Sequence, residues 1–595
     1  MVRDTESRLS ALRAALVDNG LDGFIMMTGD EHISEFVAAY SQRVAWLSGF
    51  TGSTGKVAVL VDRAAIFVDA RYSSIVREQV DPAHWQYADE PETNIAEWLT
   101  QNAAAGSRIG YDARLYTRGA IQAIEQKLGD RVVLVPLQRN PVDPLWPDQP
   151  ARPVTPAFIQ PDALAGKSSG AKRADVTSWL HSIGADACVL VALDSIAWLF
   201  NLRGSDNPIA PINFAYAVCH SDGTADLFID LAKIDAAVRE HLADDVRIVP
   251  YDRFYGALEA FEGKLVAVDP ARTPAAIYDA LAAGGARAVD HRDPTILPKA
   301  TKNEAEIDGF RRAHVLDGAA LTRFLHWFAK EAPKGELTEL SAAAKLTNFR
   351  REIGELHGLS FEPVSAADGN AAMPHYSASA DSNAPIRPDG IYLVDSGGQY
   401  PSGTTDVTRT VAVGKASAEF RNRFTLVLKA HIALDTAAFP PGTLGSQLDA
   451  IARAPLWASG IECAHGIGHG VGHFLNVHEG PVYIARARPE EVPVQAGMVL
   501  SNEPGYYKAD QFGIRTENLV VVVDKPVDGA VMPMLGFETL TMAPIDREVI
   551  DLQMLTSAEL DWVDRYHATV FERLSPLLAA EERHWLEHRT APLAS

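Results

Sequence analysis

The sequence predicts a mixed α/β (α+β) protein in which two related α/β domains precede a larger third domain. Three observations support this expectation: strings that recur in the first half, two boundaries marked by prolines, and a concentration of His, Asp and Glu in the second half. A chain of 595 residues is also too long for one hydrophobic core, so several domains are expected.

The first half of the chain is predicted to contain the same α/β unit twice, the alternative being a generic α/β alternation. The string "LVDNGLDGFIMM", which begins at Leu16, is echoed by "LHSIGADACVLV", which begins at Leu180. In the same order, "RVAWLSGFTGS" is echoed by "SIAWLFNLRGSD", and "AAIFVDARY" by "TADLFIDLAK". Each copy reads as a helix, an apolar strand, a turn and a pair of strands. Neither copy contains a cluster of histidines and carboxylates, so we expect the chemistry to lie in the third domain.

Prolines indicate where the domains meet. Seven prolines fall within the 21 residues from Pro141 to Pro161, which excludes a helix there and disfavours a central strand. Pro294 and Pro298 precede a polar stretch and a long helical pattern. We therefore expect domains at 1–150, 151–297 and 298–595, the last with a C-terminal extension from about residue 530.

The composition disfavours several classes of protein. A formal net charge of −23 argues against nucleic-acid binding, which needs a basic surface. Three scattered cysteines without CxxC spacing argue against a disulfide scaffold and a thiolate zinc site. The N-terminus lacks a secretory signal, and no segment approaches the ~20 apolar residues that cross a bilayer. We therefore expect a cytoplasmic protein without a nucleic-acid or membrane partner.

Two aspartates are predicted to meet at a hairpin. The stretch "GIYLVDSGGQYPSGTTDVTRTVAV" contains two β-type runs joined by a Gly/Pro/Ser turn. Asp395 ends the first run and Asp406 begins the second, so a hairpin would place them side by side. Two carboxylates that close repel each other unless they share a cation. The alternative is that both are ordinary turn residues.

A histidine-rich segment, "AHGIGHGVGHFLNVHEGP", follows. If Ala464–Gly472 is an extended strand, His465, His469 and His473 share one face, and glycines occupy the other, where a second backbone can approach. His478 follows in the same segment. A lone histidine is more often structural than functional. Four histidines within 14 residues, with alternate glycines, favour a functional site.

Two further carboxylates complete a set suited to metal binding. Glu503 ends an apolar run in "MVLSNEPGYY", and "FGIRTENLVVVV" places Arg515 and Glu517 two apart on one face of a strand that becomes apolar. Such a charged pair is costly unless it is paired or bound to metal. Two Asp, one His and two Glu suit divalent Mn, Co or Zn in a two-metal site better than a structural zinc.

These motifs resemble the pita-bread metallopeptidases, a family that includes methionine aminopeptidase, prolidase, creatinase and aminopeptidase P. The strings "DSGGQY", "GTTDVTRT", "FLNVHEGP", "NEPGYY" and "GFETLTMAPID" are most similar to the long, three-domain cytosolic aminopeptidase P members. The resemblance covers the whole chain. It implies two creatinase-N-like α/β domains followed by a pita-bread catalytic domain.

The resemblance also implies a role for each residue of the site. The implied metal ligands are Asp395, Asp406, His469, Glu503 and Glu517, of which Asp406 and Glu517 would bridge two ions and Glu503 would also be the general base. His375, His465 and His478 would be catalytic and contact the substrate, with His375 stabilising the oxyanion. Tyr507 would form a wall of the proline pocket, and Arg515 would orient the bridging carboxylates. His473 is an addition to the family pattern, and we expect it to pack beside the site.

The activity implied is release of the N-terminal residue from peptides with proline in the second position, by attack of a metal-bridging hydroxide on the Xaa-Pro bond. The implied cofactor is two divalent ions per subunit, Mn²⁺ before Co²⁺ or Zn²⁺, and the implied assembly is a homodimer through the catalytic domain. A prolidase-type dipeptidase shares this site, but the duplicated first half argues against it. A non-catalytic pita-bread binding protein and a metal-free creatinase-like hydrolase are disfavoured because all five ligands are present.

Overall fold

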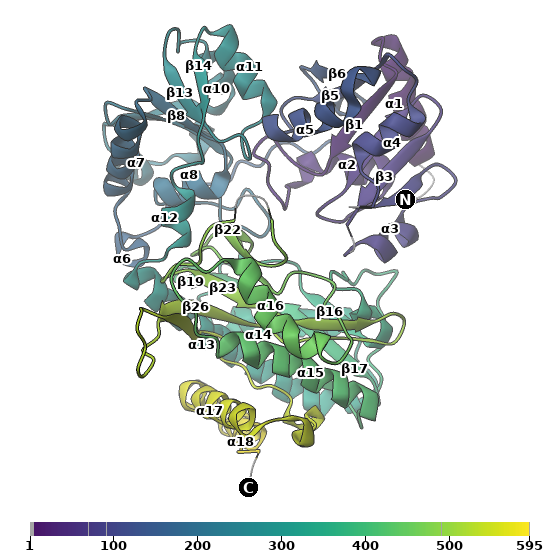
Figure 1. Ribbon diagram of the computed structural model, residues 1–595, viewed down its shortest axis with the longest axis vertical. Coiled ribbons are helices and arrows are strands. Elements are labelled where there is room, and N and C mark those ends of the chain that lie inside the picture. The colour runs from purple at the N-terminus through teal and green to yellow at the C-terminus, as the bar shows by residue number, and fades with distance from the viewer. Residues whose placement is uncertain (1–4, 70, 91, 489–490, 594–595) are drawn as a thin grey trace. The chain divides into compact units, whose positions relative to one another are not determined.

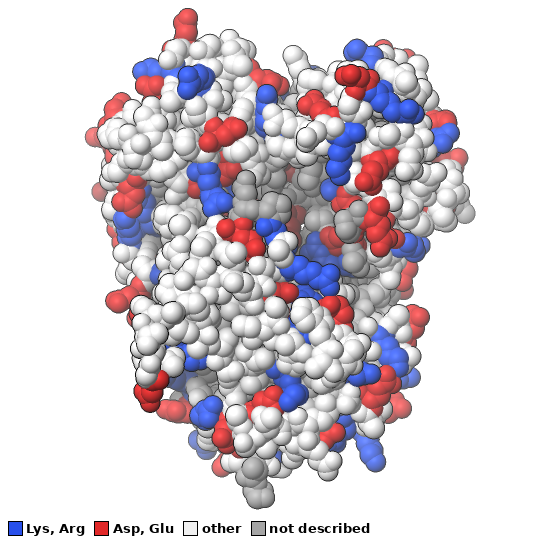
Figure 2. Space-filling view, in the orientation of Figure 1, with Lys and Arg blue, Asp and Glu red and all other residues white. Residues whose placement is uncertain are grey.

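The computed structural model describes residues 5–69, 71–90, 92–488 and 491–593 (Figure 1). The chain divides into two compact units, one of Met1–Pro161 with Lys167–Thr295 and one of Asp162–Gly166 with Ile296–Ser595. Within the described ranges, no helix combines the length and the apolar character needed to span a lipid bilayer. On the face seen in Figure 2, acidic and basic side chains are interspersed.

The first unit contains two six-stranded sheets of the same topology. Their strand orders are β4-β3-β2-β1-β5-β6 and β12-β11-β10-β8-β13-β14. The first sheet consists of β1 (Gly23–Met27), β2 (Lys56–Leu60), β3 (Ala64–Val68), β4 (Gln86–Asp89), β5 (Ser107–Asp112) and β6 (Val132–Leu137). The second consists of β8 (Ala187–Leu190), β10 (Ala215–His220), β11 (Ala225–Ile229), β12 (Val246–Pro250), β13 (Leu265–Val268) and β14 (Arg287–Asp290). In each sheet three antiparallel strands at the centre have parallel neighbours on both sides. The repeat seen in the sequence is therefore a repeat of structure.

Helices cover these sheets, and polar side chains define where several of them begin. They are α1 (Thr5–Asp18), α2 (Arg43–Ser48), α3 (Ser73–Gln79), α4 (Ile95–Asn102), α5 (Arg118–Leu128), α7 (Ser169–Ile183), α8 (Leu193–Leu199), α9 (Ala236–Leu242), α10 (Phe254–Leu258) and α11 (Ala275–Ala283). Thr117 and Ser168 accept hydrogen bonds from the first turns of α5 and α7, which satisfies backbone donors that would otherwise have no partner. The short strand β7 (Phe158–Ile159) lies inside the proline-rich segment and pairs with β9 (Leu202–Arg203).

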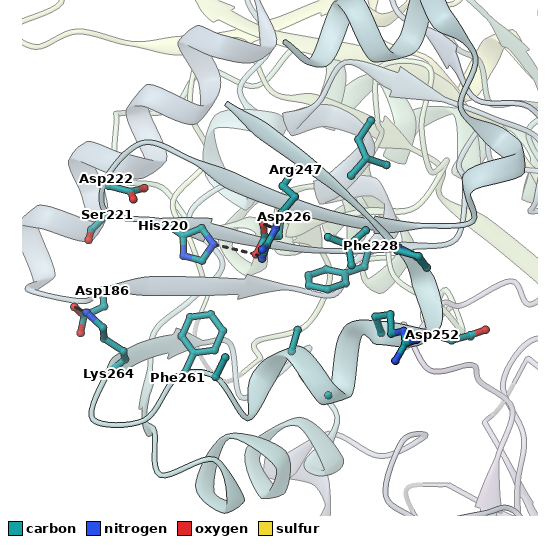
Figure 3. A pocket seen from close by; sticks show the side chains of 17 residues that line it. Asp186, His220, Ser221, Asp222, Asp226, Phe228, Arg247, Asp252, Phe261 and Lys264 are labelled. Atoms are coloured by element: carbon teal, nitrogen blue, oxygen red, sulfur yellow. Dashed lines mark hydrogen bonds and ion pairs between the residues drawn. The ribbon is translucent and has the colours of Figure 1, made fainter. Parts of the chain in front are cut away.

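The two copies differ in what covers one face of the sheet. Between β4 and β5, α4 covers this face, and Trp98 packs edge-on against Phe67 of β3. Between β12 and β13, α10 and the turn after it present small residues instead, and a groove of about 950 Å³ lies beside β11 and β12 (Figure 3). Within the groove, Asp226 accepts hydrogen bonds from Arg247 at 2.7 Å and is 3.2 Å from a ring nitrogen of His220. These charged groups therefore pair with one another.

The second unit is built from two main sheets and two small ones. The sheet β16-β17-β20 consists of Val364–Ala367, Ile391–Ser396 and Val407–Ala412. The sheet β22-β21-β23-β26-β27 consists of Glu479–Ile484, Gly468–Gly470, Val499–Asn502, Asn518–Asp524 and Leu535–Thr539. The small sheets are β15 (Gly358–Leu359), β18 (Gly398–Tyr400) and β19 (Gly403–Thr404), and the pair β24 (Gly505–Lys508) and β25 (Phe512–Arg515). The helices of this unit are α6 (Asp162–Ala165), α12 (Ile296–Ala300), α13 (Glu304–Glu331), α14 (Glu339–Glu352), α15 (Ala418–Asp435), α16 (Gly445–Trp457), α17 (Ser557–Leu574) and α18 (Ala580–Arg589).

The long helix α13 matches the helical pattern in the sequence and supports the sheet that carries the two aspartates. It begins with a capping box in which Asn303 and Glu306 each bond to the other's backbone N–H. Its apolar face then buries Phe324 and Phe328, and Phe328 stacks on Tyr392 of β17 with ring centroids 4.5 Å apart. The core under β16, β17 and β20 is therefore closed by α13 and α14.

A buried ion pair fixes α13 against α14. Arg350 donates two hydrogen bonds to Asp317, at 2.7 and 2.9 Å, and Tyr400 of β18 donates a third at 2.8 Å. The Arg350 side chain is fully buried. Desolvating two charges is costly, but the paired geometry offsets much of that cost as long as both partners remain.

A second buried guanidinium ties the C-terminal helices to the sheets. Arg409 of β20 donates hydrogen bonds to the carbonyls of Glu517 (2.6 Å), Ala543 (2.9 Å) and Pro544 (3.1 Å) and to the hydroxyl of Tyr566 (2.8 Å). The residues of α17 also belong to the same hydrophobic core as α15. The C-terminal extension is therefore packed into the catalytic unit (Figure 1).

Two local expectations from the sequence are wrong. Ala464–Gly472 is not one strand: only Gly468–Gly470 pairs as β21, and its register shifts between His469 and Gly470. An irregularity in the pairing with β22 interrupts the ladder at this point. The glycines do allow neighbouring backbone to approach, because a Cβ at Gly468 would lie 2.0 Å from the Ser501 carbonyl oxygen. Likewise, β25 ends at Arg515 and β26 begins at Asn518, so Arg515 and Glu517 do not share one strand: Glu517 lies in the break between the two.

We predict that Arg350→Leu lowers the free energy of unfolding by about 3–5 kcal/mol, because it leaves Asp317 buried without its cation. Urea denaturation of the full chain measures this change. The control is Arg312→Leu, which removes an ion pair with Glu355 whose partners are 62% and 40% exposed and should cost less than about 1 kcal/mol. Equal losses in the two variants would contradict the prediction.

Candidate metal centre

The hairpin of β17 and β20 brings the two aspartates together. The strands pair in antiparallel fashion with Asp395 opposite Thr408, and Asp406 lies directly before β20. Asp406 is buried. Asp395 accepts a hydrogen bond from Arg515 through Oδ2, while its buried Oδ1 has no hydrogen-bond partner among the described residues. A buried carboxylate oxygen in this state is suited to a cation.

His469, in β21, points at Asp406 and at Glu503. Its Nε2 lies 3.5 Å from Oδ2 of Asp406 and 3.6 Å from Oε1 of Glu503. Its Nδ1 is 2.9 Å from the carbonyl oxygen of Gly470, which can only accept, so Nδ1 carries the proton. In the neutral imidazole this leaves the lone pair of Nε2 directed at the carboxylates, as metal coordination requires.

The two glutamates lie at the ends of neighbouring strands. Glu503 follows β23, and its backbone N–H donates to the Ile467 carbonyl at 2.8 Å. Glu517 lies between β25 and β26, and its Oε2 accepts a hydrogen bond from Thr408 at 2.7 Å. Among the described residues, Asp406, His469 and Glu517 each offer one ligand atom, and these three atoms lie within 4.8 Å of one another. Asp395 and Glu503 are not part of this tight group.

The site contains more carboxylates than cationic side chains, and this excess shifts the pKa values of its residues. Burial, together with Asp406, Asp395 and Glu503, raises the pKa of Glu517 well above its usual range. Burial also raises the pKa of Asp395 to about 6, despite the opposing charge of Arg515. Burial alone would lower the pKa of His469, but Asp406 and Glu503 raise it to about 9. A divalent cation would favour the ionised forms of Glu517 and Asp395 and the neutral form of His469, so the residues present fit a metal centre.

Arg515 links Asp395 to Tyr507, which in turn contacts His465. Its guanidinium donates to Asp395 and to the hydroxyl of Tyr507, both at 2.6 Å, and to Thr408 at 3.1 Å. The same Tyr507 hydroxyl lies 2.6 Å from Nε2 of His465. Burial lowers the pKa of His465, but Cys463 and Tyr507 outweigh this effect and raise it well above its usual range.

The remaining histidines occupy three different places. His478 meets His469 edge to face, with ring centroids 4.4 Å apart. His375 is half-buried in the loop after the short helix η8 (Asp368–Ala372). His473 instead packs against Phe310 of α13, with centroids 5.5 Å apart. The even spacing of the histidines in the sequence therefore does not put them on one surface.

Two threonines of β20 also belong to the site, although the sequence analysis did not identify them. Thr408 donates to Glu517 and accepts from Arg515, and Thr410 donates to the Arg515 carbonyl at 3.0 Å. The signal was present in "TTDVTRT", because period two from Asp406 places Thr408 and Thr410 on the same face of the strand.

Comparison with known families covers nearly the whole chain. Residues 308–524 match Metallopeptidase family M24, and residues 533–593 match the C-terminal region of peptidase M24. Residues 8–141 and 148–306 each match a Creatinase/Prolidase N-terminal domain. The expected order of two related N-terminal domains and a pita-bread catalytic domain is thus confirmed.

Relatives match over the full length. A probable Xaa-Pro aminopeptidase P of Paracoccidioides brasiliensis (strain Pb03) is 39% identical over 617 residues, which cover 99% of each chain. The chain belongs to the Xaa-Pro aminopeptidase P group of metallopeptidase family M24. Another member, from Coccidioides posadasii (strain RMSCC 757 / Silveira), is 39% identical over 99% of this chain and 100% of its own.

One solved structure matches over nearly the whole chain. It is the X-prolyl aminopeptidase of Caenorhabditis elegans, described as a cytosolic enzyme with a di-nuclear active site. It is 33% identical, with a TM-score of 0.95 over 99% of this chain and 100% of its own. A prolidase of Thermococcus sibiricus, 23% identical with a TM-score of 0.52 over 64% of this chain, shares the fold alone.

We predict that His469→Ala loses bound metal and activity together, because Nε2 of His469 faces two carboxylates. His473→Ala should keep its metal and its activity while losing stability, because the ring packs against α13. Metal per chain, determined by mass spectrometry, and the unfolding midpoint separate the two effects. Depleted metal in His473→Ala with full metal in His469→Ala would reverse the assignment.

Proposed function

We propose that this member of the Xaa-Pro aminopeptidase P group releases the N-terminal residue from peptides with proline in the second position. The proposed ligands of its two divalent ions are Asp395, Asp406, His469, Glu503 and Glu517, with Asp406 and Glu517 bridging. The observation that carries the proposal is the convergence of carboxylates on His469: the buried Asp406 and Glu517 and the half-buried Glu503. We propose Mn²⁺ as the native ion, before Co²⁺ or Zn²⁺, because the ligand set is rich in oxygen.

When bound, a pair of divalent cations lowers the pKa of water and polarises a carbonyl oxygen. The protein residues supply the rest of the reaction. Glu503 would accept the proton of the attacking water, and its carboxylate lies within 3.6 Å of His469. Arg515 would hold Asp395 in place through their 2.6 Å hydrogen bond.

The remaining side chains would position the substrate. We propose that His375 stabilises the developing oxyanion and that His465 and His478 contact the peptide. Tyr507, held between Arg515 and His465, would form one wall of the pocket for proline. The imino nitrogen of proline would leave after it is protonated.

The wider organisation is also part of the proposal. We place the domain boundaries at 1–150, 151–297 and 298–595, and we propose a cytoplasmic homodimer that assembles through the catalytic domain. The cytosolic solved relative supports the location. The homodimer rests on the likeness to the family described above.

A substrate series tests the proposal against the prolidase alternative. After chelation, the chain should cleave neither an Xaa-Pro-Xaa tripeptide nor an Xaa-Pro dipeptide. Adding back Mn²⁺, Co²⁺ or Zn²⁺ separately should restore cleavage of the tripeptide. Restored cleavage of the dipeptide alone would support a prolidase, and full activity without metal would contradict the proposed chemistry.

We predict that Asp406→Asn lowers turnover of the tripeptide by more than tenfold, because a proposed bridging carboxylate becomes a neutral amide. Metal content and kcat should both fall. The control is Asp435→Asn in α15, which changes a buried carboxylate bonded to Thr539 and Trp562. This variant should keep its metal content and its kcat. Retention of a tenth or more of the activity in metal-loaded Asp406→Asn would contradict the dinuclear assignment.

A further inference from the structure

A fully buried glutamate lies outside the candidate metal centre. Glu339 begins α14, and its carboxylate accepts four hydrogen bonds from neutral donors. Oε1 accepts from the backbone N–H of Ala367 (2.7 Å) and the side-chain amide of Asn370 (3.0 Å). Oε2 accepts from the hydroxyl of Tyr376 (2.8 Å) and the backbone N–H of Ala384 (2.9 Å).

This position requires a carboxylate. A buried charge without a cation is costly unless several hydrogen bonds compensate for the lost solvation. All four neighbours of the Glu339 carboxylate are donors, so an acceptor-only group satisfies each of them. A glutamine would direct its own N–H groups at the donors on one side, where the backbone N–H of Ala367 or of Ala384 would lose its acceptor; the Tyr376 hydroxyl also lies 2.8 Å from the Ser382 carbonyl.

The four donors belong to the segment that carries His375. Ala367 ends β16, Asn370 lies in η8, Tyr376 follows His375 directly, and Ala384 lies beyond it. One carboxylate therefore fastens this segment on both sides of His375.

A second anchor lies on the other side of the same histidine. The carbonyl of Pro374 accepts a hydrogen bond from Arg515 at 3.4 Å, and the same nitrogen of Arg515 donates to Asp395 at 2.6 Å. His375 is thus flanked by one residue tied to the arginine of the metal centre and by another, Tyr376, tied to Glu339.

We propose that Glu339 is a positioning residue for the reaction, which acts through Tyr376 to hold His375 at a fixed place relative to Asp395. This inference rests on the proposed role of His375. It goes further by naming the residues that hold the imidazole of His375 in position. Misplacing a group that contacts the reacting atoms by about 1 Å costs ~10²-fold in rate, so a loosened loop should lower kcat.

Glu339 also supports the fold, and the test must separate the two roles. Its backbone carbonyl accepts a hydrogen bond from Ser365 at 2.7 Å, so it joins α14 to β16 independently of its side chain. Tyr376→Phe removes a single hydroxyl from the proposed path and leaves Glu339 itself in place. Asp435→Asn is the matched control, because it alters a buried carboxylate with neutral partners far along the chain from His375.

The experiment is a double-mutant cycle on the full-length, metal-loaded chain with an Xaa-Pro-Xaa tripeptide. Glu339→Gln and Tyr376→Phe should lower kcat by about 10–10²-fold, with KM changed less than twofold and metal content unchanged. In a His375→Ala background, each should lower kcat by less than about twofold, because the group that they position is absent. Asp435→Asn should lower the unfolding midpoint and leave kcat unchanged.

Other outcomes would overturn the inference. Equal losses of kcat in both backgrounds would mean that Glu339 does not act through His375, and an equal loss in Asp435→Asn would mean general destabilisation. If Glu339→Gln does not fold, Tyr376→Phe carries the same test. A silent His375→Ala would refute both the role of His375 and this inference. The proposed aminopeptidase activity is tested separately, by whether the unaltered, metal-loaded chain cleaves the tripeptide.

Discussion

The catalytic unit depends on bringing together carboxylates that repel one another in a buried place. Asp395, Asp406, Glu503 and Glu517 come from the ends of different strands, and Arg515 is the guanidinium bonded directly to one of them. A fold can hold such a set only if rigid elements oppose the repulsion. The two main sheets and the long helices packed against them provide this rigidity. A bound cation would remove the repulsion between the carboxylates.

The sequence predicted those parts of the site that depend on local pattern. The hairpin that joins Asp395 and Asp406 could be read from two alternating runs and a turn, because pairing of adjacent strands is a local event. The repeated α/β unit was readable for the same reason. The extent of the histidine strand was not readable, because the register shift between His469 and Gly470 arises in its pairing with β22, and period two along the chain cannot reveal it.

Other parts of the site gave no distinctive signal in the sequence. A glutamate in the first turn of a helix is the ordinary choice, so Glu339 looks unremarkable until its four donors are seen around it. Thr408 was readable in principle, since it shares a face with Asp406, but its partners lie about a hundred residues away in the chain. The roles assigned to the site residues remain predictions of the residue pattern and of the family likeness.

The hydrogen bonds of Arg409 have a consequence for where the working catalytic domain ends. A chain that stopped after β26 would keep every proposed ligand, yet it would remove Ala543, Pro544 and Tyr566, which accept from this guanidinium. The buried charge would keep the carbonyls of Thr408 and Glu517 and the side chain of Asn518, but it would lose half of its acceptors. The shortest fragment that folds with the site intact therefore extends through α17. The C-terminal extension belongs to the minimal catalytic domain just as the strands that carry the proposed ligands do.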